Sequence, residues 1–173
     1  MTVAAAVNGD LMRADPGRGE QASLRTWLRL LTCTNLVERE VRGRLRDKFD
    51  TTLPRFDVLA QLDAVSREPE PHLTMSELSR RLMVTNGNLT SLIERLVHEG
   101  LVRRDPAPDD KRTQIVKLTA LGKRSFDAMT PEHQRWIDDL FGGLSASERR
   151  HLYELLGKLR GSVQESLSME RAK

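Results

Sequence analysis

The spacing of apolar residues along the chain predicts a mostly helical protein. In residues 22–50, apolar side chains recur every three or four positions, as they do on one face of an α-helix. Further leucines widen this apolar stripe beyond one face, so the helix needs more than one partner to bury it. Residues 54–65 predict a second helix that begins at Pro54, because proline suits a first helical turn.

Two shorter helices are predicted between residues 74 and 100. Thr74 and Glu77 have the spacing of a capping box, in which each side chain satisfies a free backbone N–H of the other residue. After a turn at "LMV", Thr85 is placed to cap the second helix. Gly100 occupies a normal position just past a helix end. Two short helices joined by a tight turn predict a helix-turn-helix.

Residues 101–118 predict a β-hairpin. Two short runs rich in β-branched residues, "LVRRD" and "TQIVKLT", flank "PAPDDKR", which consists mostly of turn-forming and charged residues. Such a hairpin presents an exposed, charged tip beside the helix-turn-helix. The pattern therefore predicts a wing.

The remaining chain predicts two more helices. Thr119 caps a helix that runs to about residue 141, and Pro131 is expected to kink or restart it because proline removes an intrahelical hydrogen bond. Ser145 and Glu148 form a second capping box, after which apolar residues recur at helical spacing as far as Leu167. The predicted order is helix, helix, helix-turn-helix, wing, helix, helix.

Composition narrows the class of protein. The 173 residues suit one compact domain, or one domain that shares its core with a second copy. No apolar run approaches the roughly 18 residues that cross a bilayer, and residues 1–21 lack the pattern of a secretory signal. The single Cys33 can form no intrachain disulfide. We therefore expect a cytoplasmic protein without a membrane partner, with a flexible extension at 1–21 and a tail at 169–173.

Positive charge is concentrated in the middle of the chain. Residues 73–124 contain ten Lys or Arg and six Asp or Glu, an excess larger than the net charge of +3 of the whole chain. Four of these cations lie within residues 103–112. A basic middle between nearly neutral ends indicates that the middle faces an anionic polymer.

These segments resemble a known family. The stretch "DPAPDDKRTQIVKLTALGK", after "LTSLIERLVHEGLVRR", is similar to the wing and recognition helix of MarR-type winged-helix transcriptional regulators. The family's D-x-R wing motif corresponds to Asp110, Lys111 and Arg112, and its L-T-x-x-G motif to residues 118–122. The resemblance covers roughly residues 22–168, with all parts in the same order.

The resemblance implies a mainly α fold with a small β-wing. Residues 51–122 would form the winged helix-turn-helix, with the recognition helix at 86–99 and the wing at 101–118. Residues 22–50 and 123–168 would supply intertwined dimerisation helices. The protein would then be a homodimer that binds a pseudo-palindromic DNA operator, most simply as a repressor. The broad apolar stripes of the terminal helices support a dimer independently, although they can also pack on each other within one chain.

The candidate DNA-binding residues belong to the helix-turn-helix and the wing. Arg112 is expected to enter a minor groove, with the Asp110 carboxylate orienting its guanidinium; the alternative is an ordinary solvated charge cluster. Polar residues on the recognition helix suit base edges, since Asn pairs with adenine and Arg with guanine. The full candidate set is Ser76, Asn86, Gly87, Asn88, Thr90, Ser91, Arg95, Arg103, Asp110, Lys111 and Arg112.

The recognition helix begins with poor helix formers. Asn86, Gly87 and Asn88 follow the capping Thr85, so they occupy a first turn in which few intrahelical hydrogen bonds are at stake. This turn is the part of a recognition helix that points into the major groove. Gly87 would let the backbone come close to DNA, and the two asparagines would read bases.

A small-molecule effector is a further implication of the resemblance. Members of the family commonly bind aromatic or phenolic ligands, and segments of this chain resemble the branch that controls aromatic-acid and hydroxycinnamate catabolism. The effector would be an aromatic acid or its aryl-CoA thioester. Its candidate residues are Trp27, Leu31, Arg55, Phe56 and Leu59, with Arg55 holding an anionic group. In the alternative interpretation, Trp27 and Phe56 are plain core and Arg55 is a surface residue.

Two other functions compete with this interpretation. Cys33 can make the chain a redox sensor, but the first helix offers no group placed to activate its thiol, which favours a small buried or interface residue. A winged helix can also serve protein–protein interaction, with the wing charges needed only for solubility. The His and Cys residues show no metal-ligand spacing, and no phosphate loop or nucleophile elbow is present. We therefore expect no cofactor, no metal and no enzyme activity.

Overall fold

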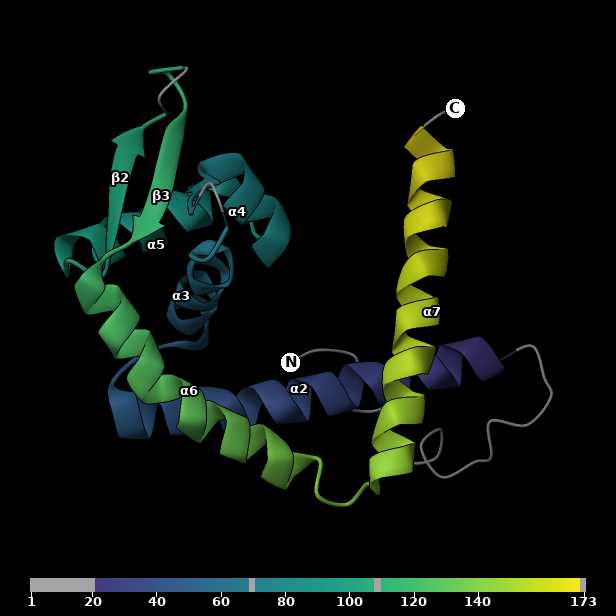
Figure 1. Cartoon of the computed structure of the whole chain (residues 1–173). Coiled ribbons are helices and arrows are strands. Elements are labelled where there is room, and N and C mark those ends of the chain that lie inside the picture. Colours follow the sequence, from purple (N-terminus) through teal and green to yellow (C-terminus); the bar gives the residue numbers. More distant parts are fainter. Residues whose placement is uncertain (1–20, 69–70, 108–109, 172–173) are drawn as a thin grey trace, which may run out of the picture. The chain divides into compact units, whose positions relative to one another are not determined.

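The computed structural model describes residues 21–68, 71–107 and 110–171, and this part is mainly helical (Figure 1). The elements in chain order are α2 (Ala22–Phe49), α3 (Leu53–Val65), β1 (Leu73–Thr74), α4 (Met75–Leu82), α5 (Asn86–His98), β2 (Val102–Pro106), β3 (Gln114–Leu118), α6 (Ala120–Leu140) and α7 (Ala146–Arg171). The predicted class, mainly α with a small β-wing, is confirmed. The extension expected at residues 1–21 lies almost entirely outside the described residues.

Three details differ from the expectations. A two-residue strand, β1, was not predicted; it pairs with β3 instead of forming part of the loop before α4. The helix α6 runs through Pro131 without the restart that was one of the two expectations, because proline removes only one backbone donor from the helix. The last helix, α7, extends to Arg171, beyond the end expected at residue 168.

The sheet has the strand order β1-β3-β2, and both pairings are antiparallel. Val102 pairs with Leu118 at one end of the hairpin and Pro106 with Gln114 at the other. The wing is therefore the predicted hairpin. It is connected to the helix-turn-helix by β1, which pairs with β3 and directly precedes α4. Residues 108 and 109, within the expected wing, lie outside the described residues.

The chain forms two compact units, residues 1–130 and 131–173. The core of the first unit is built around α3 and α5: Val58, Leu62 and Ile93 are at most 1% exposed. Burying each such side chain contributes roughly 1.5–3 kcal/mol. The core thereby fixes the inner face of α5 and leaves its other face free for function.

The start of α6 packs very closely against the start of the wing. The Thr119 hydroxyl accepts a hydrogen bond from the Gly122 N–H at 3.0 Å and donates to the Gly100 carbonyl at 2.7 Å. A Cβ on Gly122 would lie only 2.0 Å from the carbonyl oxygen of Leu101. The "LTALG" segment therefore has a structural reason: threonine caps the helix, and glycine permits this contact.

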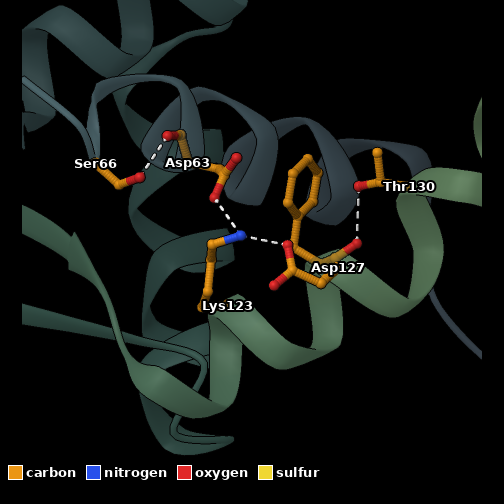
Figure 2. Close-up of polar contacts among 6 residues, drawn as sticks. Asp63, Ser66, Lys123, Asp127 and Thr130 are labelled. Atoms are coloured by element: carbon orange, nitrogen blue, oxygen red, sulfur yellow. Dashed lines mark hydrogen bonds and ion pairs between the residues drawn. The ribbon is translucent and has the colours of Figure 1, made fainter.

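A lysine joins α6 to α3 in the first unit (Figure 2). Lys123 forms ion pairs with Asp127 of its own helix and with Asp63 of α3, the second at 3.2 Å. The hydrogen bond to Asp127, followed by that to Asp63, raises the pKa of Lys123. The two helices are thus connected by charge and also by the contact of the Phe56 and Phe126 rings, whose centroids are 5.4 Å apart and whose planes are tilted by 39°.

The second unit contains the end of α6 and all of α7. Ser145 and Glu148 form the predicted capping box, with the Ser145 N–H donating to the Glu148 carboxylate at 2.8 Å. Along α7, several large apolar side chains are 40–51% exposed in the single chain. They are Leu155, Leu156, Leu159, Val163 and Leu167.

Candidate nucleic-acid interface

The turn between α4 and α5 is held by local hydrogen bonds. Thr74 and Glu77 make the predicted capping box at the start of α4. At its end, the Ser79 hydroxyl donates to the Val84 carbonyl at 2.6 Å, and the Val84 N–H donates to the Ser79 carbonyl at 3.2 Å. Met83 between them has a left-handed backbone with φ of 54°. These contacts set the direction in which α5 leaves the turn.

The recognition helix α5 separates a buried face from an exposed polar face. Leu89, Ile93 and Leu96 are 0% exposed. The polar face carries most of the candidate residues, and of these only Thr90 is partly buried. Exposed on it are Asn86, Gly87, Asn88, Ser91 and Arg95.

The first turn of α5 is weakly capped. Thr85 caps it by accepting a hydrogen bond from the Asn88 N–H, but at 3.4 Å this bond is long. The Thr90 hydroxyl donates to the Asn86 carbonyl at 2.8 Å. A Cβ on Gly87 would meet nothing within 4 Å, so the glycine is not required by packing within the chain.

The wing tip is ordered by Asp110, though not in the expected way. Its carboxylate accepts hydrogen bonds from the backbone N–H of Arg112 at 2.9 Å and from the Thr113 hydroxyl at 2.8 Å. These bonds, the backbone one first, lower the pKa of Asp110. We expected the carboxylate to hold the Arg112 guanidinium; instead it closes the turn and leaves that guanidinium exposed.

A polar hollow of about 380 Å³ opens between α4, α5 and the wing. We call it the basic hollow, because two arginines and no acidic residue line it. Its lining residues are Thr74, Met75, Ser76, Asn86, Thr90, Arg104, Arg112, Thr113 and Gln114. The hollow thus brings four of the candidate residues, from two helices and the wing tip, into one site.

The structure also shows what the sequence analysis missed. Arg104 lines the basic hollow, whereas the candidate Arg103 lies exposed and pairs with Asp105 at 3.4 Å. Residues alternate between the two faces of a strand, so Arg104 shares a face with the buried Val102. The apolar Val102, two positions before Arg104, was the signal in the sequence from which the inward-facing arginine could have been identified.

The remaining candidate DNA-binding residues lie outside the hollow. Lys111 is exposed at the wing tip, and Arg95 is exposed further along α5. Asn88 and Ser91 are exposed on the same helix. They are therefore available to a ligand that is larger than the hollow and extends along α5.

The five candidate effector residues differ widely in exposure. Trp27 is 55% exposed on α2, and Leu31 of the same helix is half-buried. Phe56 and Leu59 of α3 are 6% and 1% exposed, in the core. None of these residues lines the basic hollow or the hollow found on the second unit.

Arg55, the expected anion-binding residue, has a partner within the chain. Its guanidinium forms an ion pair with Glu99, which directly follows the recognition helix. Arg55 therefore links the start of α3 to the end of α5. An anionic ligand at this position would have to compete with Glu99.

Cys33 is exposed on α2. Of the two structural explanations expected for it, burial within the single chain is therefore wrong, and a place in an interface stays a prediction. The described residues contain no group of three or more His, Cys, Asp or Glu arranged to hold a metal ion. In the same part of the chain, no helix combines the length and the apolarity that a membrane span needs.

Together, an exposed polar helix, a wing and a basic hollow define a winged-helix DNA-binding protein. Comparisons with known proteins identify the family. The sequence model of the MarR family matches residues 49–113. An HTH-type transcriptional regulator of Bacillus cereus is 32% identical over 134 residues, which are 77% of this chain and 85% of that protein. The chain belongs to the MarR family of transcriptional regulators.

Two further relatives agree with this assignment. The HTH-type transcriptional regulator PecS of Dickeya dadantii is 30% identical over 125 residues, covering 72% of this chain and 73% of that protein. The crystal structure of a mutant MarR from E. coli complexed with operator DNA matches with a TM-score of 0.69 at 29% identity. It covers 82% of this chain and 99% of that chain.

Proposed function

We propose that this DNA-binding regulator is a homodimeric repressor that binds a pseudo-palindromic operator and leaves it when a small ligand binds. The observation that carries the DNA-binding part is the basic hollow, which joins the first turn of α5 to the Arg112 side of the wing. A duplex that receives α5 in its major groove brings its backbone and adjacent minor groove to the wing.

The roles of the candidate residues follow from their chemistry. Asn86 and Asn88 donate to and accept from adenine in the major groove, and Arg95 pairs with guanine. Arg112 enters the minor groove, where narrow A·T-rich stretches concentrate negative potential. Ser76 binds a backbone phosphate, as hydroxyls do in such interfaces.

A homodimer is supported by apolar surface on each unit taken by itself. In the first unit, Leu24, Trp27 and Leu36 of α2 are 49–55% exposed, and in the second unit α7 carries the exposed row that ends at Leu167. Large exposed apolar patches mark interaction surfaces. A twofold dimer would cover them and present two recognition helices about 34 Å apart, one turn of DNA.

The experiment that tests the DNA-binding role compares two wing variants. Arg112→Ala should weaken binding to the DNA upstream of the protein's own gene by at least about tenfold, measured by fluorescence anisotropy, without changing the melting temperature. Lys117→Ala, a change of another wing cation, is the matched control and should bind almost normally. Unaltered binding by Arg112→Ala would remove the assigned role.

The salt dependence of the same binding separates DNA recognition from the competing interaction role. A protein that neutralises several phosphates loses affinity steeply as salt rises, with a slope of about −0.9 per phosphate. A winged helix used only for protein–protein interaction would show neither operator preference nor this slope.

Light scattering tests the dimer. The wild-type chain should be a dimer at micromolar concentration, and Leu159→Asp should shift it toward monomer because a charge would enter the apolar interface. Lys158→Asp, one position away, changes charge without removing an apolar contact and is the control. A wild-type monomer would contradict the proposal.

The effector proposed here is an aromatic acid or its aryl-CoA thioester, and it rests on the family resemblance. Arg55 supports an anionic ligand, since a ligand carboxylate or phosphate that displaced Glu99 would free the end of the recognition helix. Benzoyl-CoA or coumaroyl-CoA should raise the melting temperature in a saturable way, and CoA alone should not. Absence of any shift would discard this effector class.

A further inference from the structure

The two arginines of the basic hollow have no counter-ion in the described part of the chain. None of the ion pairs found there includes Arg104 or Arg112, whereas the neighbouring Arg103 pairs with Asp105. Two like charges without a neutralising partner in one hollow repel each other. An anion bound between them would remove this repulsion.

Arg104 is the more deeply placed of the two. It is half-buried on β2, and its Nε is covered by protein without any hydrogen-bond partner. An unpaired donor on a charged group that water cannot reach is costly, and such a cost is commonly offset by a ligand. Arg103 beside it faces the other side of the strand and is neutralised by Asp105.

The uncharged side chains of the hollow suit an anion with several oxygen acceptors. The Ser76 hydroxyl and the amides of Asn86 and Gln114 line it and make no hydrogen bond with the other described residues. All three can donate, and a guanidinium matches two oxygens of a phosphate at once. The nearest capping carboxylate, Glu77, is already bound by the Thr74 N–H at 2.8 Å.

We propose that the basic hollow binds one phosphate group and that Arg104 is its principal ligand. This inference rests on the proposed operator binding: in the complex, the phosphate is a backbone phosphate of the strand beside the groove that α5 enters. Arg104 then holds α5 beside this groove through the DNA backbone alone. It contributes to affinity at every sequence and reads no base itself.

The matched pair Arg104→Gln and Arg103→Gln tests the assignment, because each removes one charge from adjacent positions of the same strand. Operator affinity of Arg104→Gln should fall about tenfold, and the slope of log K against log salt should become less steep by about 0.9. The ratio of affinities for the operator and a base-substituted operator should not change. Arg103→Gln should retain a slope close to that of the wild type. Neither variant should melt below the wild type, and Arg104→Gln should melt slightly higher, because it removes an uncompensated charge from the free protein.

Operators with a single neutral methylphosphonate locate the phosphate. For the wild type, one position in each half-site should reduce binding most strongly. For Arg104→Gln, a methylphosphonate at that position should cause no further loss of affinity, because the variant no longer contacts this phosphate. Methylphosphonates at the other positions should weaken its binding as they weaken that of the wild type. If both variants respond identically at every position, the assignment of Arg104 is overturned.

Failure of this inference is distinguishable from failure of the proposed function. If Arg104→Gln binds like Arg103→Gln while Arg112→Ala is impaired, the phosphate site is overturned and operator binding stands. If the wild type binds no DNA, the phosphate site is tested by itself: the melting temperature is measured with and without inorganic phosphate at constant ionic strength. Stabilisation of the wild type but not of Arg104→Gln would support a site for free phosphate, and absence of stabilisation would overturn the site.

Discussion

Replacing Gly122 with alanine tests the close contact between α6 and the wing. The added Cβ would lie 2.0 Å from the Leu101 carbonyl oxygen and 2.9 Å from its carbon, whereas a carbon and an oxygen normally approach to about 3.3 Å. Either the helix or the strand must therefore move by more than about 1 Å. This contact is to backbone, so no side-chain rotation can relieve it.

The magnitude follows from three contributions. Overpacking costs typically about 1–3 kcal/mol, and the severity of this contact favours the upper end. Displacement also threatens the hydrogen bond from the Thr119 N–H to the Leu101 carbonyl, which is 3.1 Å long and contributes about 1 kcal/mol. Alanine recovers about 1 kcal/mol through its higher helix propensity. The net loss of unfolding free energy is therefore about 3 kcal/mol.

Urea denaturation followed by circular dichroism measures this loss, and Gly87→Ala is the matched control. A Cβ at Gly87 meets nothing within 4 Å, so this variant should be as stable as the wild type or slightly more stable. If Gly122→Ala stays within about 0.5 kcal/mol of the wild type, the contact does not constrain the fold as argued.

Three other changes have definite expected outcomes. Burial, followed by the nearby charge of Glu38, raises the pKa of Asp57 from 3.8 to about 6. The folded state therefore binds the proton of this carboxyl group more tightly than the unfolded state does, and the unfolding free energy falls as pH rises from about 4 to 6. Asp57→Asn should therefore be more stable than the wild type at pH 7.5 in urea, with the gain vanishing near pH 4. Met83→Gly should raise unfolding free energy by about 1 kcal/mol because it relieves a left-handed backbone at an exposed residue, and an unchanged melting temperature would contradict this. Thr74→Ala should cost about 1 kcal/mol in thermal unfolding, because the capping box with Glu77 is lost.

Local signals in the sequence were sufficient for most elements of the fold. The capping boxes at Thr74 and Ser145 depend on residues three positions apart, so their geometry is determined within one helical turn. The strand β1 was missed because two residues carry no periodicity, and only the pairing of Leu73 with Val116 makes them a strand. Long-range contacts of this kind cannot be inferred from a short local pattern.

The candidate site was predicted in part for a similar reason. Residues of α5 were assigned correctly to its polar face because helical spacing separates that face from the core. Arg103 was chosen over Arg104 because composition alone does not distinguish neighbouring cations, although the position of Val102 does. Phe56 and Leu59 were effector candidates through the family resemblance, and the sequence left open whether such apolar residues form a core or a cavity wall; in this chain both are buried.

Gly87 joins the fold to the function and gives a last prediction. Within the chain, nothing prevents a side chain at this position, and alanine would even favour the helix. A glycine that costs helix stability without a packing reason suggests that the space outside it is needed by a partner. Gly87→Ala should therefore keep or increase stability and weaken operator binding by about tenfold, the size of one good base contact. Operator affinity equal to that of the wild type would show that α5 approaches DNA by another part of its exposed face, with Arg95 and Ser91 as the next residues to test.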